Sequence, residues 1–92
     1  MWTNGVINVI DIEAKVIRAV HFQAKVCDEP SSYGICDGRI FKLQLEIYGE
    51  VVCNYDRGWD ICPTCFAAEV ALRELLNMYD GRSLDAEIIY ED

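Results

Sequence analysis

The sequence predicts an α+β domain in which an antiparallel sheet of three or four strands packs one face against a single amphipathic helix. Apolar and polar residues alternate through residues 39–48, which is the pattern of a strand buried on one face. Apolar residues recur at helical spacing through residues 63–79. A chain of 92 residues has room for one core. We therefore expect a single domain over 1–92, with strands within 5–60, a C-terminal helix over 63–79 and an acidic tail over 82–92.

The N-terminal segment is expected to be strand. Residues 5–27 are rich in Val and Ile and contain no proline. Asp11 is the turn-prone residue inside this segment, so residues 6–20 fit either one long bent strand or a hairpin. A helix over 13–24 is the weaker alternative. Residues 28–34 combine proline, glycine and polar side chains, and they predict a loop before the alternating strand.

The middle of the chain contains a second expected turn. Gly49 predicts a reversal into a strand over 51–56, after which residues 57–60 leave the sheet through a loop. In that loop we expect Gly58 at positive φ and Trp59 plugging the sheet against the helix.

The helix has recognisable ends. Pro63 suits its first turn, where no backbone donor is needed, and Gly81 supplies its C-terminal stop. Beyond it, residues 88–90 are apolar enough for a short edge strand.

The charge of the chain limits its ligands. Sixteen acidic residues against eight basic ones give a formal charge of −8. This balance argues against nucleic acid or an anionic membrane as a direct ligand, and it favours a basic protein surface as the partner. No apolar run approaches the roughly 20 residues that span a bilayer, and the first residues lack the start of a secretion signal. We expect a cytoplasmic protein.

The cysteines form the most distinctive chemical group. Five cysteines in a reducing compartment favour metal binding or redox chemistry over disulfides. Strand pairings that keep apolar residues on one face set Leu45 opposite Cys53 and Phe22 opposite Phe41. Extended past the strand ends, the two pairings gather four cysteines at one end of the sheet. These are Cys27, Cys36, Cys62 and Cys65.

Four thiolates are a common donor set for zinc, and Cys62 and Cys65 have the commonest short ligand spacing. The sequence therefore predicts a structural zinc ion held by the four gathered cysteines. One alternative is a redox-active pair of Cys62 and Cys65, in which the following helix N-terminus acidifies the first thiol. Another is cysteines without any ligand. Cys53 is expected to be a small buried hydrophobe.

No catalytic residues are predicted, and we expect the protein not to be an enzyme. His21 falls on the polar face of its strand, and the six extended residues to Cys27 span about 20 Å, too far for a ligand or a base. Asp56 and Asp60 flank Arg57, as paired catalytic acids can, but a loop held by a salt bridge explains this pattern better.

Several short motifs resemble those of one family. They occupy residues 24–26, 32–35, 38–40, 42–43 and 54–60, followed by Pro63, and the most specific is the run NYDRGWD at 54–60. Over residues 22–79 the chain is similar to a family of small uncharacterised proteins from Firmicutes phages and mobile elements. The family pattern lacks the cysteines, so a zinc site would belong to this member alone.

The resemblance implies an inhibitor in the cytoplasm of a bacterial host, because small acidic phage proteins include anti-CRISPR inhibitors of the type II RNA-guided DNA nuclease. Such a nuclease holds nucleic acid in positively charged channels, for which an acidic domain can compete. The acids expected to contact the nuclease lie near the cysteines and in the adjacent loop. They are Asp28, Glu29, Asp37, Asp56 and Asp60. The alternatives are a metal-carrying or redox-active small protein, and a phage protein that binds another basic host factor.

Overall fold

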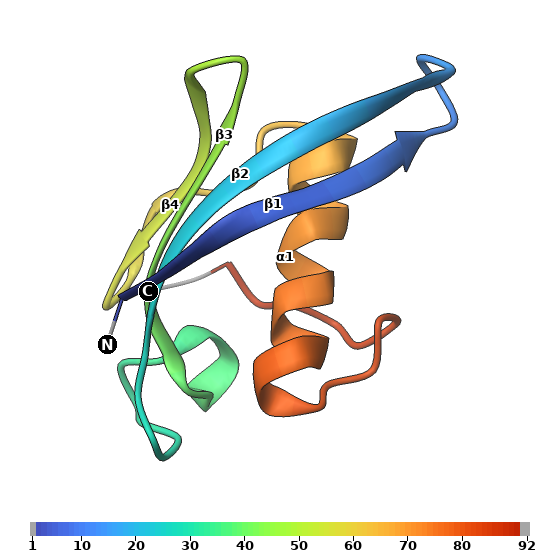
Figure 1. The fold of residues 1–92 in the computed structure, drawn as a ribbon. Helices are drawn as coiled ribbons and strands as arrows, with labels where there is room; N and C mark the ends of the chain where they lie inside the picture. The colour runs from blue at the N-terminus through green and yellow to red at the C-terminus, as the bar shows by residue number, and fades with distance from the viewer. Residues whose placement is uncertain (1, 91–92) are drawn as a thin grey trace.

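The computed structural model describes residues 2–90, which form a five-stranded antiparallel sheet with one helix packed on one face (Figure 1). The strands lie side by side in chain order, each pairing with the next. The elements are β1 (Trp2–Asp11), β2 (Val16–Val26), the short 3-10 turn η1 (Ile35–Asp37), β3 (Ile40–Ile47), β4 (Glu50–Asp56), β5 (Trp59–Ile61) and α1 (Phe66–Asp80). The α+β class and the antiparallel sheet with one C-terminal helix are confirmed, whereas the sheet has five strands and not three or four.

The N-terminal segment is a hairpin of β1 and β2, so the alternative of one long strand is excluded. Asp11 forms the turn, because its carboxylate accepts hydrogen bonds from the backbone N–H groups of Glu13 and Ala14 at 3.1 and 3.0 Å. The same carboxylate binds Arg18 at 3.0 Å. These contacts satisfy a side chain that is nearly buried, and they fix the point at which the chain reverses.

The strand register was partly predicted by the apolar pattern. Leu45 pairs with Cys53 as expected, although a bulge after Leu45 shifts the rest of the β3–β4 hairpin by one residue. The expected pairing of Phe22 with Phe41 is wrong, because Phe22 pairs with Leu45. A displacement of four residues keeps the side chains from Leu43 to Leu45 on their expected faces, so the alternation of apolar residues does not detect it. Beyond Leu43 a bulge pairs Val26 with Ile40, so Ile40 and not Phe41 is buried in the core.

The cause of this displacement is the loop between β2 and β3. The backbone N–H of Cys27 donates to the carbonyl of Arg39 at 2.8 Å, so the hairpin closes at that pair. The intervening residues fold inward and bury Ile35, which is 1% exposed, in the core. The buried side chain needs a longer loop than the sequence suggested, and Cys27 is therefore not opposite Cys36.

The fifth strand arises at residues 57–58, where the chain turns back along β4 instead of leaving the sheet. Tyr55 pairs with Trp59, and Asn54 pairs with Ile61. The residue at positive φ in this turn is Arg57, with φ of 56°, and not Gly58. Three residues of β5 are too few to show a strand pattern in the sequence.

Two segments cover the inner face of the sheet. Helix α1 packs mainly on β1, β2 and β3, and it ends as expected at Gly81, whose φ of 64° is left-handed. It starts at Phe66, so Pro63 precedes the helix and does not lie in its first turn. No helix among residues 2–90 is both long and apolar enough to cross a membrane.

The tail after α1 covers the β5 side of the inner face, and residues 88–90 do not form the expected edge strand. Ile88 is buried in the core. The indole N–H of Trp59 donates to the carbonyl of Ile89, and the Trp59 ring packs edge-on between Tyr55 and Tyr90, each 5.0 Å away. Trp59 thus joins the sheet to the tail, and it also packs against the hydrophobic core to which α1 contributes.

Candidate partner-binding site

The loops at one end of the sheet form a connected surface, which we call the loop end. It consists of residues 27–39, between β2 and β3, and residues 56–60, at the turn into β5, and its β2–β3 loop lies at the bottom of Figure 1. Two hydrogen bonds hold the parts beside each other: the hydroxyl of Tyr55, which directly precedes residues 56–60, donates to the carbonyl of Tyr33, and the N–H of Arg57 donates to the carbonyl of Phe41 on β3, both at 2.9 Å. The sequence analysis predicted that these two loops lie together, and the structure has them side by side.

All five acids predicted to contact a partner are in the loop end, and all five are exposed. They are Asp28, Glu29, Asp37, Asp56 and Asp60. Asp56 is also held by Lys42 at 3.8 Å and by Arg57 at 3.3 Å. Both ion pairs are substantially exposed to solvent, so they contribute little to stability. The two neighbouring cations partly offset the negative potential of Asp56 at the surface.

Three arginines have a different role, because their guanidinium groups bind main-chain carbonyls. Arg39 donates to Cys27 and to Tyr79, both at 2.9 Å, and so joins the loop end to the last turn of α1. Arg73 and Arg82 donate to carbonyls of the tail, at Leu84 and Ala86 and at Glu87 respectively. These guanidinium groups therefore fix the loop end and the tail against the rest of the fold.

A shallow cavity of about 470 Å³ lies between the loop end and the tail. Arg57 and Arg82 line it together with Asp37 and Glu87, and Trp59 forms part of its apolar wall. The two positive and two negative side chains balance, so the cavity has no strong preference for a charged ligand.

The four cysteines predicted to bind zinc are not brought together. Cys27 and Cys36 lie in the loop end, whereas Cys65 precedes the first residue of α1. The last residue of α1, Asp80, accepts a hydrogen bond from the N–H of Arg39 in the loop end at 2.9 Å. A helix of 15 residues is about 22 Å long, so Cys65 lies far from the loop end.

A tetrahedral zinc ion needs its ligands within about 2.3 Å, and this arrangement does not fit that requirement. Among residues 2–90, no group of three or more His, Cys, Asp or Glu side chains is arranged to hold a metal ion. The β2–β3 register that supported the zinc prediction is wrong, so zinc binding stays a prediction without that support.

The thiol nearest Cys62 along the sheet is Cys53, a relationship that sequence reasoning missed. Asn54 pairs with Ile61, and continuing this register sets Cys62 beside Cys53. Burial, with a smaller contribution from the neighbouring Cys62, raises the pKa of the Cys53 thiol to about 12. The expectation that Cys53 is a buried hydrophobe is confirmed, since its side chain is fully inaccessible. Finding the pair would have required predicting β5.

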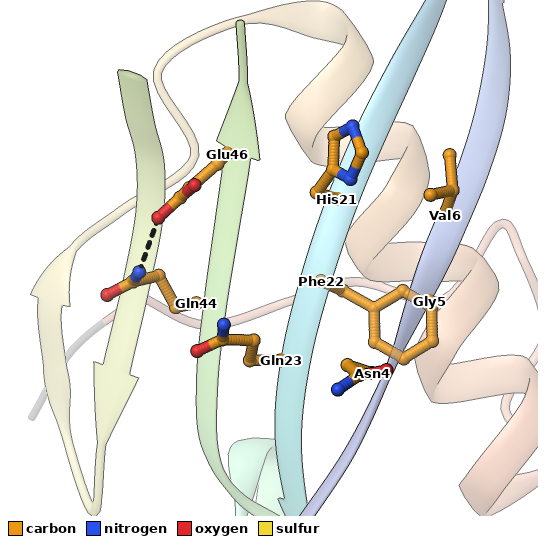
Figure 2. A pocket seen from close by; sticks show the side chains of 8 residues that line it. All are labelled: Asn4, Gly5, Val6, His21, Phe22, Gln23, Gln44 and Glu46. Carbon is orange, nitrogen blue, oxygen red and sulfur yellow. Dashed lines mark hydrogen bonds between the residues drawn. The ribbon is translucent and has the colours of Figure 1, made fainter. Parts of the chain in front are cut away.

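The outer face of the sheet, opposite α1, has a row of amide side chains that the sequence analysis also missed. Asn4, Gln23, Gln44 and Asn54 are successive cross-strand partners on β1 to β4. Figure 2 shows the first three in a shallow pocket of about 270 Å³, where Gln44 donates to Glu46 at 2.7 Å. His21 is exposed here, as predicted, with Glu46 as its partner on β3. Finding this row required the β2–β3 register.

The fold and this surface define a small α+β domain with an exposed acidic end and a sheet that is open on its outer face. The chain belongs to the family described as Domain of unknown function (DUF7678), whose model matches residues 1–80. No curated protein and no solved structure matches the chain.

Proposed function

We propose that this chain is a non-catalytic binding domain that docks its acidic loop end onto a basic protein surface, and that its partner is a type II CRISPR RNA-guided nuclease. The observation that carries the proposal is the exposure of all five loop-end acids on segments joined by hydrogen bonds. Such a surface presents several carboxylates at fixed positions, as electrostatic recognition of a basic partner requires.

The choice of partner comes from the chemistry of the nuclease and from the family resemblance in the sequence. An RNA-guided nuclease binds its nucleic acids through positively charged channels. A folded acidic domain that occupies such a channel blocks target DNA without needing sequence recognition. Zinc is not required for this mode of action, because the loop end is held by hydrogen bonds between the protein's own groups.

The test is a charge-reversal pair measured against the guide-loaded nuclease. The triple variant Asp28→Lys, Glu29→Lys and Asp37→Lys should abolish both nuclease binding and the block on target DNA. The control reverses Glu13 and Glu50, which are also exposed but lie in or beside turns at the opposite end of the sheet. This control should bind like wild type.

Binding should also weaken as salt rises, because exposed charges more than about 8 Å apart are screened at physiological ionic strength. If the wild-type protein neither binds the nuclease nor changes its DNA affinity at low salt, the nuclease is not the partner. If the two charge-reversal variants behave alike, the loop end is not the contact surface. Binding to a different basic host protein with the same variant pattern would keep the surface and replace the partner.

A second candidate function is redox chemistry at Cys62 and Cys65. Both thiols are exposed, and Cys65, which two residues separate from Cys62, lies directly before the first residue of α1. A redox role predicts that the protein catalyses reduction of insulin disulfides by dithiothreitol, and that Cys62→Ser stops this catalysis. An inactive wild-type protein would contradict it.

A further inference from the structure

Strand β1 forms one edge of the sheet, and its free side is a long uncharged surface. The strand runs over ten residues and pairs only with β2 among the strands of the described chain. From Trp2 to Ile10 it has no charged residue and no proline. Natural proteins usually protect such an edge with charge, proline or a bulge, because its unpaired backbone groups bind other strands.

The side chains that β1 presents on the outer face are partly apolar. Trp2, Val6 and Ile10 are 57, 49 and 69% exposed. Asn4 and Asn8 alternate with them on the same face. Ile17, which pairs with Ile10 from β2, is also exposed and extends the apolar area at that end.

The order of these residues is self-complementary. If a second β1 lies antiparallel with Val6 opposite Val6, then Trp2 falls opposite Ile10 and Asn4 falls opposite Asn8. Apolar residues therefore meet apolar ones, and amides meet amides, in every outer-face pair. Cross-strand pairs of these kinds stabilise a sheet, whereas a shift of two residues would set Asn4 opposite Val6.

We propose that two copies of this chain pair through β1, antiparallel about a two-fold axis at Val6, and so join two five-stranded sheets into one continuous sheet of ten strands. The nine uncharged residues span about 30 Å, which gives the pairing a full strand length of main-chain hydrogen bonds. The occupant is a second copy because the pattern of β1 complements itself.

The inner face supports the same register. Gly5 has no side chain, and the ring of Phe22 occupies the place of its Cβ, which would lie 2.9 Å from the ring (Figure 2). In the paired dimer the residue opposite Gly5 is Ile7 of the second copy. Its half-buried side chain would then lie beside the Phe22 ring, which covers Gly5, and so meet an apolar group.

Charge also favours this edge over other surfaces for self-association. Each copy has a formal charge of −8, so faces rich in carboxylates repel one another. The β1 edge from Trp2 to Ile10 is uncharged, and Asp11 beyond it is paired with Arg18. Antiparallel pairing directs the two acidic loop ends in opposite directions, so they stay apart.

The experiment compares the wild-type chain with Val6→Lys by light scattering after size exclusion. The wild type should have about twice the mass of a 10.5 kDa chain. Val6→Lys should be a monomer with an unchanged circular dichroism spectrum, because Val6 is half exposed and two lysines would face each other at the axis. The control Gln23→Lys adds the same charge on the same face but one strand inward, and it should stay a dimer.

Hydrogen exchange supplies a second readout that locates the interface. Amides on the free side of β1 should exchange at least tenfold more slowly in the wild type than in Val6→Lys at the same protein concentration. A wild type that stays monomeric up to millimolar concentration would overturn the proposal. A dimer that Val6→Lys does not dissociate, with β1 amides exchanging equally fast in both proteins, would also overturn it.

Discussion

Replacing Gly34 by alanine tests how tightly the β2–β3 loop is packed. A Cβ at this position would lie 1.9 Å from the carbonyl oxygen of Gly38. That oxygen is backbone and accepts a hydrogen bond from the N–H of Ser31 at 3.0 Å, so it cannot move aside freely. The φ of Gly34 is −79°, a conformation that alanine adopts without strain. Steric collision is therefore the only cost of the substitution.

The sign of the change in unfolding free energy shows whether steric overpacking or the reduced entropy of the unfolded chain dominates. Without the collision, alanine would stabilise the fold by about 0.4–1 kcal/mol, because it restricts the unfolded chain. Overpacking costs about 1–3 kcal/mol, and a contact of 1.9 Å with backbone belongs at the upper end of that range, so we expect a net loss of about 2 kcal/mol in the free energy of unfolding. In a chain of this size that corresponds to a fall in Tm of about 8–16 °C.

The assay is urea unfolding followed by circular dichroism, with Gly49→Ala as the matched control. Gly49 lies in the open β3–β4 turn with φ of 78°, and a Cβ there would contact nothing within 4 Å. The control should therefore be destabilised only by placing alanine in a left-handed conformation, which costs about 1 kcal/mol. If Gly34→Ala is as stable as wild type, or more stable, the described packing of the loop is incorrect.

Two further outcomes are expected. The backbone N–H of Ala14, followed by Arg18, holds the pKa of Asp11 below its ordinary value. The carboxylate therefore stabilises the fold above roughly pH 4, and this contribution is lost as the pH falls through the folded-state pKa. The stability difference between wild type and Asp11→Asn should shrink from about pH 5 to pH 3 in urea titrations; a constant difference would contradict this. The double variant Cys62→Ser and Cys65→Ser should keep the wild-type Tm, since both side chains are exposed. Release of one equivalent of zinc and a large fall in Tm would instead support the four-cysteine site.

The sequence predicted those parts of the fold that depend on residues close together in the chain. The alternation before Gly49 identified β3 and its pairing with Cys53, because a hairpin turn limits the possible registers. The apolar stripe and Gly81 identified α1 and its end within a few residues. The choice between hairpin and long strand at Asp11 stayed open, because it depends on hydrogen bonds of one carboxylate.

The grouping of the loop-end acids was predicted correctly, because it depends only on which strands are neighbours. The grouping of the cysteines was not, because it depends on the exact strand register. Bringing the acids of both loops to one end required only that β2, β3 and β4 be successive antiparallel neighbours. Gathering the cysteines required the exact partner of Phe22, and side-chain alternation determines the face of a residue but not its partner. Burial of Ile35 decided the loop length, and a single isoleucine among polar residues gives no sign that it faces inward.

The tail held by Arg73 and Trp59 has an electrostatic consequence. A free acidic tail would behave as a flexible polyanion whose charges adjust to any basic surface. Here Asp85 and Glu87 lie on backbone that is anchored at Leu84, Ala86 and Ile89, so their charges belong to a rigid body. Together with the loop-end acids, these carboxylates give the molecule an asymmetric electrostatic potential. If the proposed basic partner binds, this arrangement would favour one orientation of approach, and recognition would depend on the positions of the charges as well as on their sum.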